Sequence, residues 1–226
     1  MADRAPTSMS GSRDDDPDRF GSDSFYSSIG RAFVAMCAFV PLLFLVQFVN
    51  RLTGDRLQRD GGIQPHALQG LDGVVLAPFL HASFEHVTAN SVPLILLGTF
   101  VLASGTRRFL AATVFIAIAS GLGVWLVGDP RTVIVGASGV IFGYFGLLVV
   151  RGVVERSWWN VAVALLIALL YGWQLVGVLP VVESNISWQG HLCGLVAGMV
   201  AAVLFRRRRP RRAVPADGDD LTLPIS

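Results

Sequence analysis

Ser138 lies among small residues in the apolar stretch VIVGASGVIFGYFG, residues 133–146. A serine hydroxyl is a weak nucleophile until a base accepts its proton, and histidine is the usual base. The stretch SWQGHLCGLVAG contains His191, and HASFEHVTAN places His86 and Asn90 four residues apart, on one face of a helix. These residue types suit acyl transfer, with His191 as the base and with His86, Asn90 and the Ser138 backbone N–H as donors to an oxyanion.

A third residue, a carboxylate, normally orients the histidine of such a site. The apolar stretches around Ser138 and His191 contain no Asp or Glu, and the nearest acids are Glu85, Asp129 and Glu183 at the edges of loops. The sequence therefore predicts a Ser–His dyad rather than a triad.

The composition indicates a membrane protein. Hydrophobic residues make up 53% of the 226 residues and charged residues only 15%, with a mean hydropathy of +0.58. A soluble domain carries about 25% charged residues, so this chain lacks the polar residues to cover itself. The formal net charge of +2 gives no reason to expect a nucleic-acid partner.

Six segments are apolar and long enough to cross a bilayer, which takes about 20 residues per helix. They predict an all-α integral membrane protein with six transmembrane helices at about 32–49, 87–104, 109–128, 133–150, 158–179 and 188–205. We expect three parts: a disordered cytoplasmic tail at 1–30, the six-span domain at 31–206, and an Arg-rich cytoplasmic tail at 207–226.

Arginine residues near the span ends predict the orientation, because cytoplasmic loops are enriched in positive charge. With the N-terminus inside, eleven arginines lie on the inner side and four on the outer side. Both termini are therefore expected in the cytoplasm, with the chain in a bacterial plasma membrane. The C-terminal RRRRPRR is interpreted as a stop-transfer anchor that contacts anionic lipid.

This orientation brings the polar residues to one depth near the outer surface. Ser138 is expected about five residues into its span, roughly 7–8 Å below the surface, with the histidines and Asn90 at similar depth. Small residues at helical spacing allow close helix contact in membranes. The glycines expected to support packing around Ser138 and His191 are Gly136, Gly139, Gly143, Gly194 and Gly198.

Together these residues resemble the rhomboid intramembrane serine proteases, over roughly residues 31–206. The resemblance is carried by HASFEHVTAN, GASG and GHLCGLVAG, in that order. It implies a six-helix rhomboid bundle that cleaves single-span transmembrane substrates near the outer side of the bilayer, without a metal or organic cofactor. It also implies that Ser138 is the nucleophile and His191 the general base, and that His86 and Asn90 line the oxyanion hole.

Two departures from the family pattern stand out. Many members carry a Trp-Arg pair in the first external loop, where this chain reads GLDGVVLAPF. Many place a Tyr against the catalytic histidine, where Phe142 can stack but cannot donate a hydrogen bond. His66 and His81 are assigned to loops, although His81 matches a common family position without an assigned catalytic role.

Other interpretations remain open for these residues. Ser138 taken alone fits a small packing residue between helices, and Asn90 taken alone fits a hydrogen bond to a neighbouring helix. The alternative function is a catalytically inactive rhomboid-like protein that binds and escorts membrane proteins. A small transporter is disfavoured, because the polar residues stop in the outer third of the spans and no inverted repeat is visible.

Overall fold

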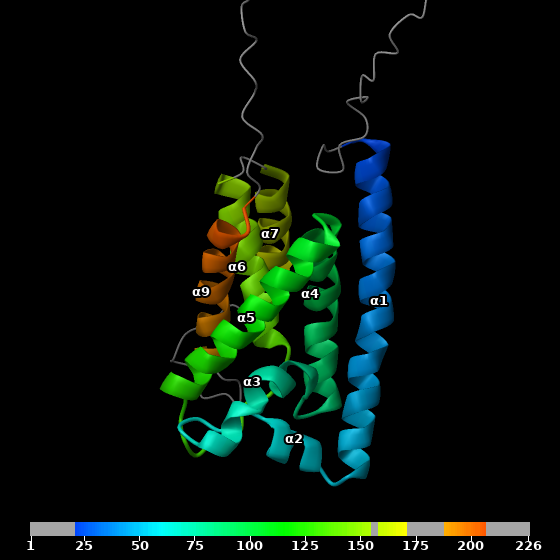
Figure 1. Cartoon of the computed structure of the whole chain (residues 1–226). Coiled ribbons are helices and arrows are strands. Elements are labelled where there is room, and N and C mark those ends of the chain that lie inside the picture. The colour runs from blue at the N-terminus through cyan, green and yellow to red at the C-terminus, as the bar shows by residue number, and fades with distance from the viewer. Residues whose placement is uncertain (1–20, 155–157, 171–187, 207–226) are drawn as a thin grey trace, which may run out of the picture.

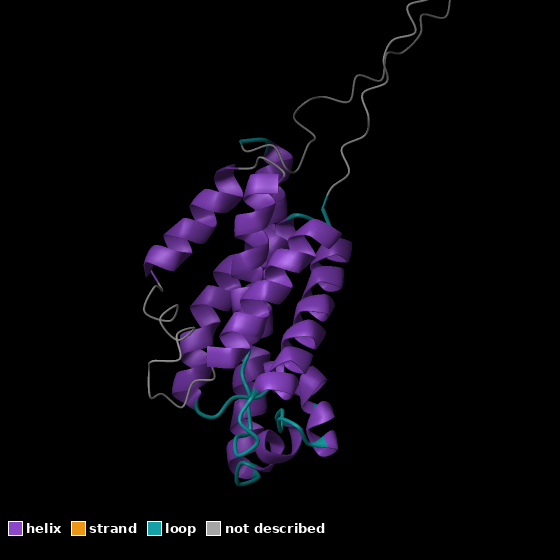
Figure 2. Cartoon of the chain, turned by 90° about the vertical axis from the view of Figure 1, so that its left-hand side faces the viewer, coloured by secondary structure: helices purple, strands orange, loops and turns teal. Residues whose placement is uncertain are grey.

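The computed structural model describes residues 21–154, 158–170 and 188–206, and these residues are helical apart from their connecting loops (Figures 1 and 2). Among the described residues, the only β structure is one isolated antiparallel bridge. The all-α prediction is confirmed to this extent. The longer helices are α1 (Asp23–Leu52), α4 (Phe84–Ala103), α5 (Thr106–Val127), α6 (Ser138–Val154), α7 (Trp158–Leu170) and α9 (Trp188–Leu204).

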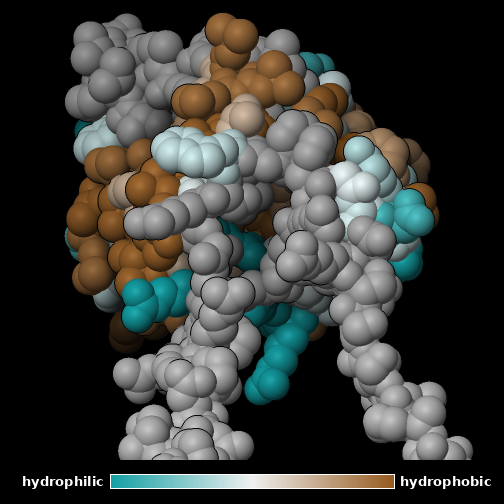
Figure 3. Space-filling view, turned by 90° about the horizontal axis from the view of Figure 1, so that it is seen from above, coloured by the Kyte–Doolittle hydropathy of each residue, from teal (hydrophilic) through white to brown (hydrophobic). Residues whose placement is uncertain are grey.

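Three of the described helices, α1, α4 and α5, are long and apolar enough to cross a membrane by length and composition. Helices α6 and α9 are apolar but have 17 residues each. Seen from the end where α1 begins, hydrophobic side chains occupy much of the circumference (Figure 3). Large apolar side chains that are exposed on the outside of a helical bundle are typical of a membrane protein.

Helix α1 begins at Asp23, nine residues before the predicted span. Ser22 caps it, since its hydroxyl accepts a 3.1 Å hydrogen bond from the backbone N–H of Phe25. Residues 23–30, which the sequence assigns to the N-terminal tail, are therefore helical. The remainder of the two predicted tails, 1–20 and 207–226, lies outside the described residues, as does 171–179 of the fifth predicted span.

Helix α6 begins at Ser138, so the predicted start at residue 133 is wrong. Residue Ile134 is extended and exchanges two 2.9 Å backbone hydrogen bonds with Ile63. Gly136 has φ +127°, and its N–H donates to the carbonyl of Ala77 at 2.9 Å. These bonds hold 133–137 outside the helix, and Ser138 is its first residue rather than lying five residues inside it.

The loop that joins α1 to α4 is folded. It contains α2 (Arg56–Gly61), η2 (Leu68–Leu71), α3 (Gly73–Leu76) and η3 (Ala77–Phe79), at the end of the molecule opposite the start of α1 (Figure 1). It is tied to the end of α5, because the Trp125 indole N–H donates to the Ala67 carbonyl at 2.8 Å. The His66 Nε2 lies 3.2 Å from the Gly128 carbonyl oxygen.

Helix α6 lies at the centre of the bundle. It packs against α9 along its length, α5 crosses both obliquely, and α1 packs on α4 (Figure 1). The largest cluster of buried apolar side chains includes Leu97, Ile116 and Leu148 from three helices. Tyr144 is buried among them, and its hydroxyl pairs with Thr113 Oγ1 at 2.8 Å. The fold therefore fixes α6, whose first residue is Ser138.

Candidate active site

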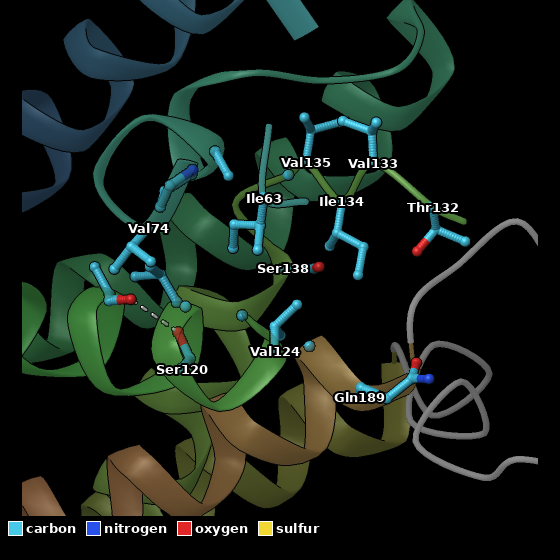
Figure 4. Close-up of a pocket in the computed structure, with 18 of the residues that line it drawn as sticks. Ile63, Val74, Ser120, Val124, Thr132, Val133, Ile134, Val135, Ser138 and Gln189 are labelled. Carbon is cyan, nitrogen blue, oxygen red and sulfur yellow. Dashed lines mark hydrogen bonds between the residues drawn. The ribbon is translucent and has the colours of Figure 1, made fainter. Parts of the chain in front are cut away.

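Ser138 faces a cavity of about 660 Å³ at the end of the molecule where the α1–α4 loop lies. The cavity is lined by the start of α6, by α5, by the loop and by the first residues of α9. Figure 4 shows the Ser138 hydroxyl between Ile63 and Ile134 on one side and Ser120 and Val124 on the other. The predicted nucleophile is thus at a helix N-terminus, next to space that a substrate can enter.

Glycines bring α6 and α9 into backbone contact. A Cβ atom added to Gly194 would overlap the carbonyl oxygen of Gly139, and one added to Gly198 would overlap the carbonyl oxygen of Gly143. Neither position can carry a side chain unless a helix moves. Four of the glycines predicted to support packing are therefore paired across this interface, two from each helix.

His191 lies in the first turn of α9 and is buried, with 5% of its surface exposed. Its ring stacks on Phe142 of α6, with ring centroids 4.2 Å apart and an angle of 17° between the planes. Phe142 follows Ser138 by one helical turn, and Gly194 follows His191 by three residues. The stack and the glycine contact place His191 at the same end of the α6–α9 interface as Ser138.

His86 and Asn90 approach the backbone just before Ser138. A Cβ added to Gly136 would lie 2.7 Å from His86 Cε1, 2.8 Å from His86 Nε2 and 3.8 Å from Asn90 Nδ2. Asn90 is 4% exposed, and its Nδ2 finds no hydrogen-bond partner among the described residues. A buried amide N–H₂ without a partner is costly. It is available to an oxygen that arrives beside Gly136.

The acids near the cavity are otherwise engaged or exposed. Asp129 lines the cavity, but its carboxylate accepts hydrogen bonds from Arg131 at 2.7, 2.9 and 3.0 Å. The hydrogen bonds from Arg131 lower the pKa of Asp129 to about 2. Glu85 is exposed at the first turn of α4, and Glu183 lies outside the described residues.

Two residues to which the sequence analysis gave no role border the site. Ser120 of α5 is buried, and its Oγ lies 3.3 Å from the Cβ position of Gly139. His81 is 1% exposed, and its Nε2 accepts the N–H of Ala137 at 3.4 Å. The position of His81, five residues before His86 in HASFEHVTAN, was visible in the sequence, but its contact with Ala137 depends on the fold of the loop.

Ser138 and His86 line the cavity, whereas the buried His191 ring and Asn90 amide adjoin the lining residues Gly190 and Gly136. Within the described residues, no three His, Cys, Asp or Glu side chains come together as a metal ion would require. A hydroxyl beside a histidine and a pair of N–H donors can attack a carbonyl carbon and hold the oxyanion that forms.

Comparison with known proteins bears on the same segment of the chain. Residues 70–208, which include Ser138, His191, His86 and Asn90, match the Rhomboid domain family. An uncharacterized protein of Mycobacterium tuberculosis is 43% identical over 188 residues, which cover 80% of this chain and 78% of that protein. An uncharacterized protein of Mycobacterium leprae is 36% identical over 195 residues, covering 83% and 77%. A Bacillus subtilis protein with a provisional rhomboid protease name is 28% identical over 141 residues, covering 59% and 66%.

Proposed function

This chain belongs to the rhomboid family, and on that premise we propose that it is an intramembrane serine endopeptidase with a Ser138–His191 dyad. The observation that carries the proposal is the convergence of three helix starts on one cavity. The cavity is lined by Ser138 as the first residue of α6, by His86 in the first turn of α4, and by Gly190 in the first turn of α9. His191 directly follows Gly190, and Asn90, one turn after His86, has an Nδ2 without a partner among the described residues. A packing role for Ser138 alone requires neither the cavity nor the unpaired donor.

The reaction begins when a substrate carbonyl enters the cavity beside Ser138. His191 takes the hydroxyl proton as Ser138 Oγ attacks the carbonyl carbon, and the C=O electron pair moves onto oxygen. Asn90, His86 and the Ser138 N–H donate to this oxyanion, with the N-terminus of α6 adding favourable electrostatics. His191 then gives its proton to the leaving amine nitrogen, and the C–N bond breaks to leave an acyl-serine.

A water molecule completes the cycle. His191 takes a proton from the water as its oxygen attacks the acyl carbon, and the tetrahedral species collapses with Ser138 as the leaving group. His191 returns the proton to Ser138, and the product leaves as a carboxylic acid. Because this step needs water, the cavity must be open to an aqueous phase at the end of the molecule where the loop lies.

The substrates we propose are single-span membrane proteins, cut near the outer side of the bilayer. In this proposal six helices span a bacterial plasma membrane, and both termini lie in the cytoplasm. Arg107 and Arg108 near the start of α5 and Arg151 near the end of α6 support the orientation, because they lie at the end opposite the cavity.

The test compares cleavage of a model single-span substrate by the wild type, Ser138→Ala and His191→Ala, at equal amounts in the same detergent. Labelling by a fluorophosphonate, which reacts with activated serines, is read on the same samples. We expect Ser138→Ala to lose both signals and His191→Ala to lose most of both. Cleavage retained in Ser138→Ala would contradict the proposed nucleophile.

A wild type that neither cleaves nor labels with several substrates would instead favour the alternative, an inactive rhomboid-like protein that binds and escorts membrane proteins. That outcome would be checked by copurification of single-span proteins with the wild type and with Ser138→Ala. Binding that does not depend on Ser138 fits the escort function.

A further inference from the structure

We propose that His81 is a positioning residue, a neutral hydrogen-bond acceptor that fixes the backbone of residues 136–138 and thereby aims Ser138. The consequence for catalysis rests on the proposed protease function, whereas the backbone contact does not. His81 lies in the loop before α4, is 1% exposed, and its Nε2 accepts the backbone N–H of Ala137. It therefore acts through the backbone and not on the substrate.

The segment before Ser138 is held almost wholly by the α1–α4 loop. Ile134 pairs with Ile63, and the Gly136 N–H donates to the Ala77 carbonyl. The Ala137 N–H, the last before the nucleophile, donates to His81 Nε2 at 3.4 Å. Ala137 is buried, so water cannot replace the imidazole as an acceptor without opening the site.

The chemistry of this bond specifies the state of the imidazole. An Nε2 atom that accepts a hydrogen bond carries no proton, so the neutral ring carries its proton on Nδ1. Burial, followed by the charge of nearby His86, lowers the pKa of His81 from 6.5 to about 3, against a smaller opposing effect of the Phe79 backbone. His81 therefore stays an acceptor throughout the neutral pH range.

The bond also restricts which donors can serve the oxyanion. The Ala137 N–H is occupied by His81, so the backbone donors available to an oxyanion at the start of α6 begin with the Ser138 N–H. The His81 ring meets His86 edge to face, with centroids 5.0 Å apart and planes at 78°. His86 in turn lies against Gly136. His81 thus restrains both the backbone before the nucleophile and one proposed side-chain donor.

The experiment uses two replacements of nearly equal shape in the full chain. His81→Gln keeps an acceptor at the end of the side chain, and His81→Met has similar length with no strong acceptor. His66→Gln is the matched control, since it changes another histidine of the same loop, whose Nε2 lies near the Gly128 carbonyl away from residues 136–138.

Two readouts are taken on purified protein in detergent: amide hydrogen exchange of peptides covering 133–142, without substrate, and kcat and KM for a model single-span substrate. We expect faster exchange in His81→Met only, with a fall in kcat of about tenfold or more and little change in KM. His81→Gln should recover most of the kcat and the exchange protection, and His66→Gln should resemble the wild type.

Each other outcome decides against a part of the proposal. Unchanged exchange in His81→Met would overturn the backbone contact, whatever the activity. Faster exchange with wild-type kcat would overturn the link to Ser138. Equal loss in Gln and Met variants, together with a lower melting temperature in both, would reduce His81 to a packing residue. Faster exchange in Met and recovery in Gln, with no activity even in the wild type, would keep the contact and reject the protease function.

Discussion

The two sides of Ser138 are built by different interactions. On its C-terminal side, α6 meets α9 through glycines, where backbone touches backbone and shape alone decides the fit. On its N-terminal side, residues 133–137 lie outside the helix and are held by hydrogen bonds to the α1–α4 loop. The first side is a steric contact between helices, and the second is a hydrogen-bonded junction. Stability should depend mostly on the first, and the alignment of Ser138 on both.

The largest effect should come from the steric side. Gly194→Ala places a Cβ on the Gly139 carbonyl oxygen, so α9 must shift away from α6. Overpacking of this kind costs about 1–3 kcal/mol or more, and the shift separates His191 from Ser138. We expect a lower melting temperature in detergent and loss of fluorophosphonate labelling.

Gly30→Ala is the matched control for Gly194→Ala. Gly30 also lies within a helix, and a Cβ added there would meet no atom within 4 Å. The Gly30 variant should keep wild-type stability and labelling. If the two variants behaved alike, the close α6–α9 contact would not be what holds the dyad.

The next largest effect is expected on the hydrogen-bonded side of Ser138. Gly136→Ala combines a strained φ of +127° with a clash against the His86 ring. We expect kcat to fall by about 10² or more, comparable to loss of an oxyanion donor, because His86 and the backbone before Ser138 both move. The measurement is single-substrate kinetics in detergent.

Gly105→Ala separates strain from contact in that experiment. Gly105 has φ +121°, nearly the same as Gly136, but a Cβ there would have no atom within 4 Å. The Gly105 variant should lose some stability through strain, about 1–2 kcal/mol, and keep its kcat. A similar fall in kcat for both would attribute the Gly136 effect to backbone strain alone.

A change that affects the rate and leaves stability nearly unchanged is expected at α4. Asn90→Ala removes an Nδ2 that has no partner within the described residues, so stability should change little. The rate should fall by roughly 10²–10³ if Asn90 holds the oxyanion. Asn50→Ala is the opposite case, because Asn50 Oδ1 accepts the Gln58 N–H at 3.1 Å and ties α1 to α2. It should lower the melting temperature and spare kcat.

The sequence predicts these two sides unequally. The α9 range was predicted to within one residue. The glycines that meet α6 were identified from their helical spacing alone, because the residues that share one face of a helix can be read from the local sequence. The start of α6 was missed by five residues, since the apolar VIV before Gly136 is compatible with both a helix and an extended strand. Its hydrogen bonds run to Ile63 and Ala77, and no local pattern encodes such distant partners.

His81 and the N-terminus of α1 show the same limit. The sequence placed His81 in a loop, which is correct, but its bond to Ala137 depends on how that loop folds over α6. Helix α1 starts earlier than its apolar run, because capping by Ser22 and helix propagation need no hydrophobic side chain. Hydropathy finds the part of a helix that meets lipid, and not where the helix ends.

The smallest effect should come from Asp129, which lies in the loop after α5 and lines the cavity. Its carboxylate is engaged by Arg131, so the dyad proposal requires that Asp129→Asn keep its cleavage rate at neutral pH within about twofold. A large loss would mean that Asp129 orients His191 and that the site is a triad.

Because the pKa of Asp129 is depressed to about 2, its ion pair with Arg131 contributes stability above about pH 4, and this contribution is lost as the pH falls toward 2. Melting temperatures measured across that window should fall more steeply for the wild type than for Asp129→Asn, while cleavage by the two at pH 7 stays the same.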